Sequence, residues 1–290
     1  MIISGEDMNL KKGLKKRKFN WINFILLLII IICLTFLIIS VKDIIVWKLD
    51  SKKIEKQVKE IQEIVKIEEV VEDLESKIEI IEPDSEIPKS SPYWDYLKMN
   101  LIYVDFSELI NINSDTKGWI QVNGTSINYP FVQAKDNKYY LTHSFDKTYN
   151  NAGWVFLDYR NKINSLNKNT IIYAHGRLDT TMFGSLKNIL KSDWLNDSNN
   201  YIVKLSTEKE NTLWQVFSVY HIPTTSDYIK TEFDSDEEFT NWTKMLINRS
   251  SYNFNTEVSE NDNVLTLSTC YNDKEKVVLH AKLIKKEIRE

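Results

Sequence analysis

Val264-Leu-Thr-Leu-Ser268 and Val277-Val-Leu-His-Ala-Lys-Leu-Ile284 are two short apolar runs near the end of the chain. Runs of about four to eight residues rich in β-branched side chains, with turn residues on either side, are typical of buried strands. Cys270 follows the first run at a distance of two residues, where a side chain is held rigidly and still reaches an open cleft. The two runs therefore predict two strands, with a cysteine just past the end of the first.

Further strands are predicted upstream, because aromatic and β-branched residues are frequent from about residue 93 onward. The dipeptide Asn123-Gly124 between two such runs is a strong hairpin signal. Met182–Leu190 and Asp236–Asn248 have helical patterns instead. The many short strands predict a mainly β domain, a closed or nearly closed β-barrel with inserted helices. The upstream strands are expected at Gly118–Val122, Ile127–Gln133, Trp154–Leu157, Thr170–Ala174, Tyr201–Leu205 and Leu213–Tyr220.

The N-terminus predicts a membrane anchor. Residues 11–18 are mostly lysine and arginine, and the apolar run Asn23–Val41 follows them. Together with Trp21 and Ile22, the run meets the roughly twenty residues that a transmembrane helix needs. A cleaved signal peptide is the alternative, but its apolar core is usually only about 7–15 residues long and ends at small residues. We therefore expect an uncleaved, single-pass signal anchor, with the basic end cytoplasmic and the remainder exported.

A charged stretch from Asp43 to Glu82 separates this anchor from the β domain. Apolar residues recur there at helical spacing, which predicts one amphipathic helix or two: Ile54, Val58, Ile61 and Val65, then Val71, Leu74, Ile78 and Ile81. Such a helix acts as a spacer, forms a coiled coil, or packs back on the domain, and we favour the spacer. The expected divisions are a basic tail (1–20), an anchor (21–41), a helical stalk and linker (42–92) and the β domain (93–290).

The chain has two cysteines, Cys33 inside the apolar run and Cys270 in the exported part. An intramolecular disulfide is therefore impossible outside the membrane. An unpaired cysteine in oxidising surroundings is either a reactive thiol or a buried, inert side chain, and both readings remain open. The net charge of −4 gives no reason to expect a nucleic-acid partner.

Four histidines are candidates to assist a reactive thiol. His175 ends the predicted strand Ile171–His175 and is followed by Gly176, which lets the chain turn away. His280 lies in the middle of a strand and is expected to be structural, whereas His143 and His221 are expected at the surface. The sequence has neither Cys-x-x-Cys nor His-x-x-x-His spacing, so neither a metal nor another cofactor is expected.

Thr266-Leu-Ser-Thr-Cys270 resembles the TLxTC signature of sortases, the cell-wall transpeptidases of Gram-positive bacteria. The resemblance extends over roughly residues 95–285. The Asp-Tyr-Arg-Asn block, the helix expected at 236–248 and the N-terminal anchor resemble class B in particular. Besides the TLxTC signature, the resemblance is carried by Gly118–Thr125 with Ile127–Pro130, Asp136–Leu141, Phe156–Asn161 (which contains the Asp-Tyr-Arg-Asn block), Ile171–His175 and Met182–Leu186.

This resemblance implies a sortase-type barrel and a cysteine mechanism. Cys270 would attack the threonine carbonyl of a C-terminal sorting signal, of Asn-Pro-x-Thr-x type, on a surface protein. An amine of a cell-wall precursor or of a pilin lysine would then release the thioacyl intermediate. His175 would protonate the leaving amine and deprotonate the incoming one. The same resemblance implies that six residues line the peptide groove: Asn137, Leu141, Thr224, Tyr228, Ile229 and Ser268. Leu141 and Ile229 are equally compatible with ordinary packing.

One position departs from the family pattern. Sortases carry a third catalytic residue, an arginine, at the start of the last strand, and Lys276 occupies that place here. Lysine is a compact point charge, whereas arginine offers a planar fork of donors, so substrate would be oriented less firmly. Lys276 is the expected oxyanion partner, with a solvated surface lysine as the alternative. Two other functions stay open: a cysteine endopeptidase with weak transfer, and a non-catalytic module that binds sorting peptides.

Overall fold

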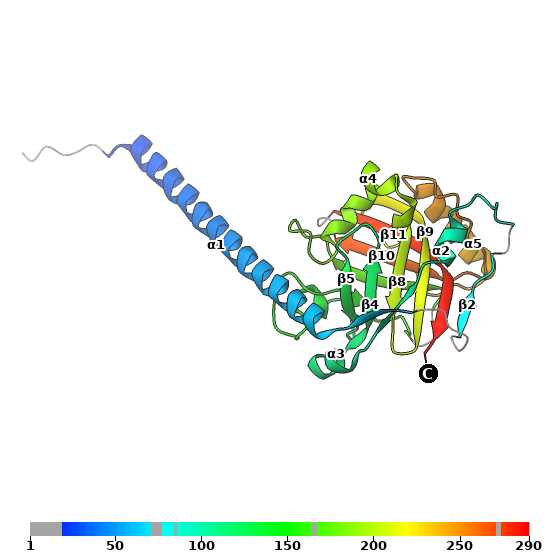
Figure 1. Ribbon diagram of the computed structural model, residues 1–290. Coiled ribbons are helices and arrows are strands. Elements are labelled where there is room, and N and C mark those ends of the chain that lie inside the picture. The colour runs from blue at the N-terminus through cyan, green and yellow to red at the C-terminus, as the bar shows by residue number, and fades with distance from the viewer. Residues whose placement is uncertain (1–18, 71–76, 84–85, 164–166, 271–273, 290) are drawn as a thin grey trace, which may run out of the picture. The chain divides into compact units, whose positions relative to one another are not determined.

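The structure is a computed structural model that describes residues 19–70, 77–83, 86–163, 167–270 and 274–289 (Figure 1). The chain forms two units, Met1–Trp47 and Lys48–Glu290. The helix α1 (Trp21–Ile64) contains the apolar run, and an 18-residue window of it has a mean hydropathy of 3.4 with none of that window buried. A helix of this length and composition is long and apolar enough to cross a membrane.

The second unit is built on a closed barrel of eight strands (Figure 1). Hydrogen bonds run in the order β10-β7-β6-β5-β4-β8-β9-β11, and the pairing of β10 with β11 closes the ring. Closure leaves no unpaired edge within the ring, and it confirms the mainly β barrel that the sequence predicts. The strands are β4 (Thr116–Val122), β5 (Asn128–Val132), β6 (Phe156–Leu157), β7 (Asn169–His175), β8 (Ile202–Ser206), β9 (Glu210–Pro223), β10 (Val264–Cys270) and β11 (Glu275–Ile288).

The hairpin predicted at Asn123-Gly124 joins β4 to β5. Gly124 has a φ of +68°, a backbone conformation that L side chains adopt rarely, so glycine suits this turn. Trp119 lies opposite Pro130 in the resulting register, and Trp119 is fully buried. Local turn chemistry and the apolar pattern therefore specify the same pairing here.

The helix α5 (Asp236–Arg249) confirms the prediction for this segment. Ser235 caps its first turn by accepting a hydrogen bond of 3.2 Å from the Glu238 backbone N–H. Phe239, Trp242 and Leu246 form its buried face and pack against side chains of β9, β10 and β11. Short helices fill the other connections: α2 (Tyr93–Leu97), α3 (Ser107–Ile112), α4 (Ser192–Leu195), η1 (Tyr139–Leu141) and η3 (Ser198–Asn200). The segment predicted as helical from Met182 is the 3₁₀ helix η2 (Gly184–Leu190).

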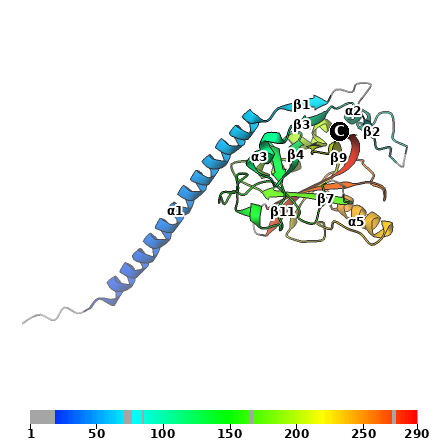
Figure 2. The same cartoon turned by 90° about the horizontal axis from the view of Figure 1, so that it is seen from below.

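The prediction that the helical stalk continues to Glu82 is wrong beyond Ile64, where α1 ends. The strands β1 (Ile67–Val70) and β2 (Ile78–Ile80) follow, while residues 71–76, which include the predicted positions Val71 and Leu74, lie outside the described residues. β1 pairs with β3 (Leu101–Val104), as Figure 2 shows, and β2 pairs with the end of β11. Backbone pairing with these strands overrides the local helical periodicity, since β-branched residues also suit strands.

The first half of the stalk is helical but is not a spacer. Ile54 and Ile61 are buried in the barrel's hydrophobic core, and Val58 is packed against it. The compact unit begins at Lys48, so residues before the expected boundary at 93 contribute to it. Of the three alternatives for this helix, the structure shows the one in which it packs back on the domain.

Candidate active site

Three strands bring the three predicted catalytic residues to one end of the barrel. β10 lies between β7 and β11, and the register places Cys270 opposite His175 on one side. On the other side it places Cys270 opposite Lys276. Neighbouring strands lie about 4.8 Å apart, so the three backbones are adjacent although up to about a hundred residues separate them in sequence.

The ring of His175 is held by the backbone of the loop after β5. Its Nε2 lies 2.8 Å from the carbonyl oxygen of Leu141. A carbonyl oxygen only accepts, so Nε2 carries the hydrogen and Nδ1 of the neutral ring is left to accept a proton. Burial lowers the pKa of His175 below 6.5, as do the charges of Arg177 and Lys276, although the hydrogen bond to Leu141 opposes them. The ring is therefore neutral at pH 7 and able to act as a base.

Lys276 is half-buried at the start of β11, where it also pairs with Ile222 of β9. Its charge contributes to the lowered pKa of His175, and its backbone lies opposite Cys270 in the neighbouring strand. Arg177 is a second cation near the histidine, two residues beyond it, and sequence reasoning missed it. Asp179 pairs with Arg177 at 2.7 Å, and both side chains are largely buried. Two cations therefore lie near His175, and the charge of one of them, Arg177, is balanced by Asp179.

The six residues predicted to line the peptide groove lie on three segments around these strands. Asn137 and Leu141 follow β5, and Thr224, Tyr228 and Ile229 lie between β9 and α5. Ser268 lies on β10, and its Oγ shares a hydrogen bond of 2.9 Å with Tyr228 Oη. Tyr228 and Ser268 are both buried, whereas the other four side chains are exposed or half-buried. Of the six, the structure thus places Tyr228 and Ser268 in direct contact.

A buried carboxylate that the sequence did not single out connects two of these segments. Asp158 directly follows β6, and its side chain is fully buried. It accepts hydrogen bonds from Arg160 Nη2 at 2.7 Å, Asn137 Nδ2 at 2.9 Å and Tyr173 Oη at 2.9 Å. Arg160 Nη2 also donates to the carbonyl oxygen of Ile229 at 2.9 Å.

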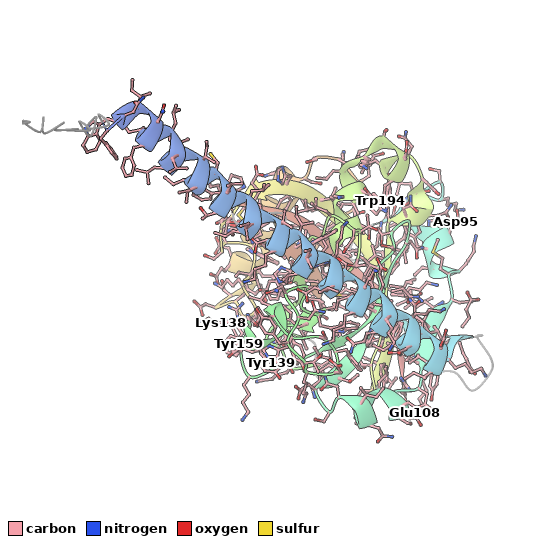
Figure 3. All side chains as sticks on the ribbon, turned by 90° about the vertical axis from the view of Figure 1, so that its left-hand side faces the viewer. Asp95, Glu108, Lys138, Tyr139, Tyr159 and Trp194 are labelled. Carbon is pink, nitrogen blue, oxygen red and sulfur yellow. The ribbon has the colours of Figure 1, made fainter. Side chains whose placement is uncertain are left out.

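Asp158 thus ties the loop after β5 to the β9–α5 connection. Burial raises its pKa, but the hydrogen bonds from Arg160 and Asn137 outweigh burial and hold the pKa below 3.8. The loops before η1 and after β6 also lie side by side in Figure 3, where Tyr139 and Tyr159 are labelled. The sequence offered one signal for this cluster, the Asp-Tyr-Arg-Asn block, but its local pattern does not reveal partners on other strands.

His280 is structural, as the sequence predicts. It is fully buried, and Thr266 Oγ1 lies 2.9 Å from its Nδ1. Because Thr266 donates its hydrogen to Asn169 Oδ1, it must accept from Nδ1, and Nε2 then accepts from Tyr220 Oη at 2.8 Å. Both ring nitrogens of the neutral form are satisfied, and burial lowers the pKa of His280 to about 3.

This histidine makes the fold sensitive to acid. Its pKa is lower in the folded than in the unfolded state, so its contribution is complete above about pH 6.5 and declines as pH falls toward 3. Between about pH 7 and pH 4.5 we expect it to remove about 3 kcal/mol from the free energy of unfolding. Urea unfolding of the full chain in detergent measures this decline, which should be smaller in His280→Asn. Equal declines in the two proteins would contradict the assignment.

Comparison with known proteins agrees with this geometry. The sequence profile of the sortase domain matches residues 120–284, which contain all three predicted catalytic residues. Sortase B of Staphylococcus aureus (strain NCTC 8325 / PS 47) is 36% identical over 184 residues, which are 62% of this chain and 75% of that protein.

Two solved structures are similar in fold. A Staphylococcus aureus sortase B–substrate complex has a TM-score of 0.58 at 36% identity, covering 62% of this chain and 84% of that one. A sortase B complexed with triglycine has a TM-score of 0.59 at 35% identity, covering 62% and 85%. The chain therefore belongs to the sortase family, and within it to class B, whose members are cysteine transpeptidases.

Proposed function

We propose that this protein cleaves a C-terminal sorting signal of Asn-Pro-x-Thr-x type after threonine and transfers the protein to a cell-wall amine. The observation that carries the proposal is the register that sets Cys270 between His175 and Lys276. The substrate complex and the triglycine complex of related sortase B proteins support a peptide substrate and an amine acceptor. The apolar part of α1 anchors the protein, with the N-terminus cytoplasmic and the catalytic domain outside.

The proposed reaction assigns a residue to each step. His175 Nδ1 takes the thiol proton, and the Cys270 thiolate attacks the threonine carbonyl carbon to form a C–S bond. Lys276 stabilises the oxyanion that develops on the carbonyl oxygen. The C–N bond then breaks as His175 returns its proton to the leaving amine. The acceptor amine attacks the thioester, gives a proton to His175 and releases the thiolate.

Transfer separates the proposal from its alternatives. The full chain in detergent is incubated with an Asn-Pro-x-Thr-x peptide library, with and without triglycine, and the products are identified by mass spectrometry. Product joined to triglycine supports the transpeptidase, and hydrolysed peptide alone supports an endopeptidase. An intact peptide library contradicts both and supports a binding module. A pilin-type lysine peptide in place of triglycine distinguishes the two acceptor classes.

We expect Lys276→Arg to accelerate transfer by roughly tenfold, because a planar fork of donors orients an oxyanion better than a point charge. The measurement is kcat/KM for triglycine-linked product. Lys274→Arg is the matched control, since Lys274 is exposed and lies two residues earlier. Equal rates in the parent and in Lys276→Arg would show that Lys276 has no part in the oxyanion site.

A further inference from the structure

One face of α1 docks on two loops of the catalytic domain. We call this face the docking stripe and define it as Asp50, Ser51, Ile54, Gln57 and Ile61. From Ser51 onward these positions lie three or four residues apart and so share one side of the helix, and Asp50 directly precedes Ser51. Ile54 and Ile61 are buried in the core, which fixes the helix in place. The polar residues of the stripe are therefore presented to the two loops.

The first loop, residues 176–183, directly follows His175. Arg177 Nη2 donates to Ser51 Oγ at 2.6 Å, and Ser51 Oγ donates to Asp179 Oδ2 at 2.7 Å. Ser51 is 6% exposed, so this contact is shielded from water. The helix hydroxyl thus completes a buried ion pair two residues from His175. The loop returns to the strand through a 3.1 Å hydrogen bond from Phe183 N–H to the carbonyl oxygen of His175.

The second loop, residues 142–151, directly follows Leu141. Phe145 N–H donates to Gln57 Oε1 at 3.2 Å, and Asn151 Nδ2 donates to Asp50 Oδ2 at 2.9 Å. Lys53, which neighbours the stripe, donates to Thr148 Oγ1 at 2.7 Å. With a further hydrogen bond of 3.3 Å from Asn150 Nδ2 to the carbonyl oxygen of Asp50, these contacts hold the loop against α1.

The two loops begin at the two partners of one hydrogen bond, which joins His175 Nε2 to the Leu141 carbonyl oxygen. We propose that the docking stripe positions His175 for catalysis by holding both loops, with Ser51 and Gln57 as the positioning residues. The inference rests on the proposed role of His175. Loss of the Ser51 or the Gln57 contact leaves the imidazole of His175 in the site but widens the range of orientations that it samples. A misplaced catalytic group lowers the reaction rate more than it weakens substrate binding.

Ser51→Ala and Gln57→Ala, each in the full chain in detergent, test this assignment. We expect each to lower kcat for peptide transfer about tenfold and to change KM less than about twofold. Alanine has the higher helix propensity in both cases, so the helix itself is not weakened. Ser51→Thr keeps the hydroxyl and should recover most of the rate. Glu55→Ala is the control, because Glu55 is exposed on the same helix.

Hydrogen exchange followed by mass spectrometry gives a readout that does not depend on activity. We expect amide exchange to rise about tenfold in residues 177–183 of Ser51→Ala and in residues 142–151 of Gln57→Ala. β8 should exchange as in the parent. Unchanged exchange in both loops would overturn the inference, whether or not the parent transfers peptide. Failure of the parent to transfer peptide would instead count against the proposed function. Faster exchange with an unchanged kcat would also overturn it.

Discussion

His175→Ala should lower kcat for peptide transfer by on the order of a thousandfold, since general acid–base catalysis contributes roughly 10²–10⁴. The neutral ring takes the thiol proton and later supplies it to the leaving amine, and alanine can do neither. Binding of the peptide should change little, because the expected groove contacts come from other residues. Steady-state kinetics on the full chain, with triglycine as acceptor, separate the effect on kcat from that on KM.

His221→Ala is the control for this substitution. His221 is exposed on β9, where its Nε2 lies 3.6 Å from Glu275 Oε2. Its removal should leave kcat within about twofold of the parent, as is usual for a surface side chain without a catalytic role. A similar loss in both variants would show that the result reflects a general change in the protein rather than proton transfer at His175.

Asp158→Ala should have the largest effect on stability, with about 2–4 kcal/mol lost from the free energy of unfolding. The buried carboxylate accepts hydrogen bonds from Arg160, Asn137 and Tyr173, and its removal leaves these donors without their partner. The expected loss of unfolding free energy is smaller than for a fully buried ion pair because the Arg160 side chain is 36% exposed. Urea unfolding of the full chain measures the loss.

The same substitution should raise KM for the sorting peptide by about tenfold or more, because Asp158 joins the loop of Asn137 to that of Ile229. Asp158→Asn keeps an acceptor oxygen, so its KM and its free energy of unfolding should both lie between those of the parent and of Asp158→Ala. Asp193→Ala is the exposed control. A normal KM in a destabilised Asp158→Ala would show that the carboxylate supports the fold but does not shape the groove.

The strands were predictable because the information is local. Runs such as Val264–Ser268 and Thr170–Ala174 show their type by their own composition, and Cys270 and His175 stand at or just beyond their ends. Which strands pair is not local. The placement of Cys270 between His175 and Lys276 therefore comes from the structure.

The rest could not be read from local pattern because it depends on partners distant in sequence. The periodicity of Ile54 and Ile61 predicts an amphipathic helix, but it does not say what covers the apolar face, so the spacer was the wrong choice. Asp158 looked like one polar residue of a family block, and its role appears only when Tyr173 and Asn137 are placed around it. Backbone pairing with β3 likewise converted residues 67–70 from the expected helix into a strand.

Intact-mass spectrometry of the full chain, mixed with a sorting peptide that it cleaves and no acceptor amine, tests the central claim most directly. The account predicts a mass increase equal to the acyl part of the peptide ending in threonine, absent from Cys270→Ala and discharged when triglycine is added. A peptide that is cleaved without such an adduct, or an adduct that persists in Cys270→Ala, would contradict the assignment of Cys270 as the nucleophile.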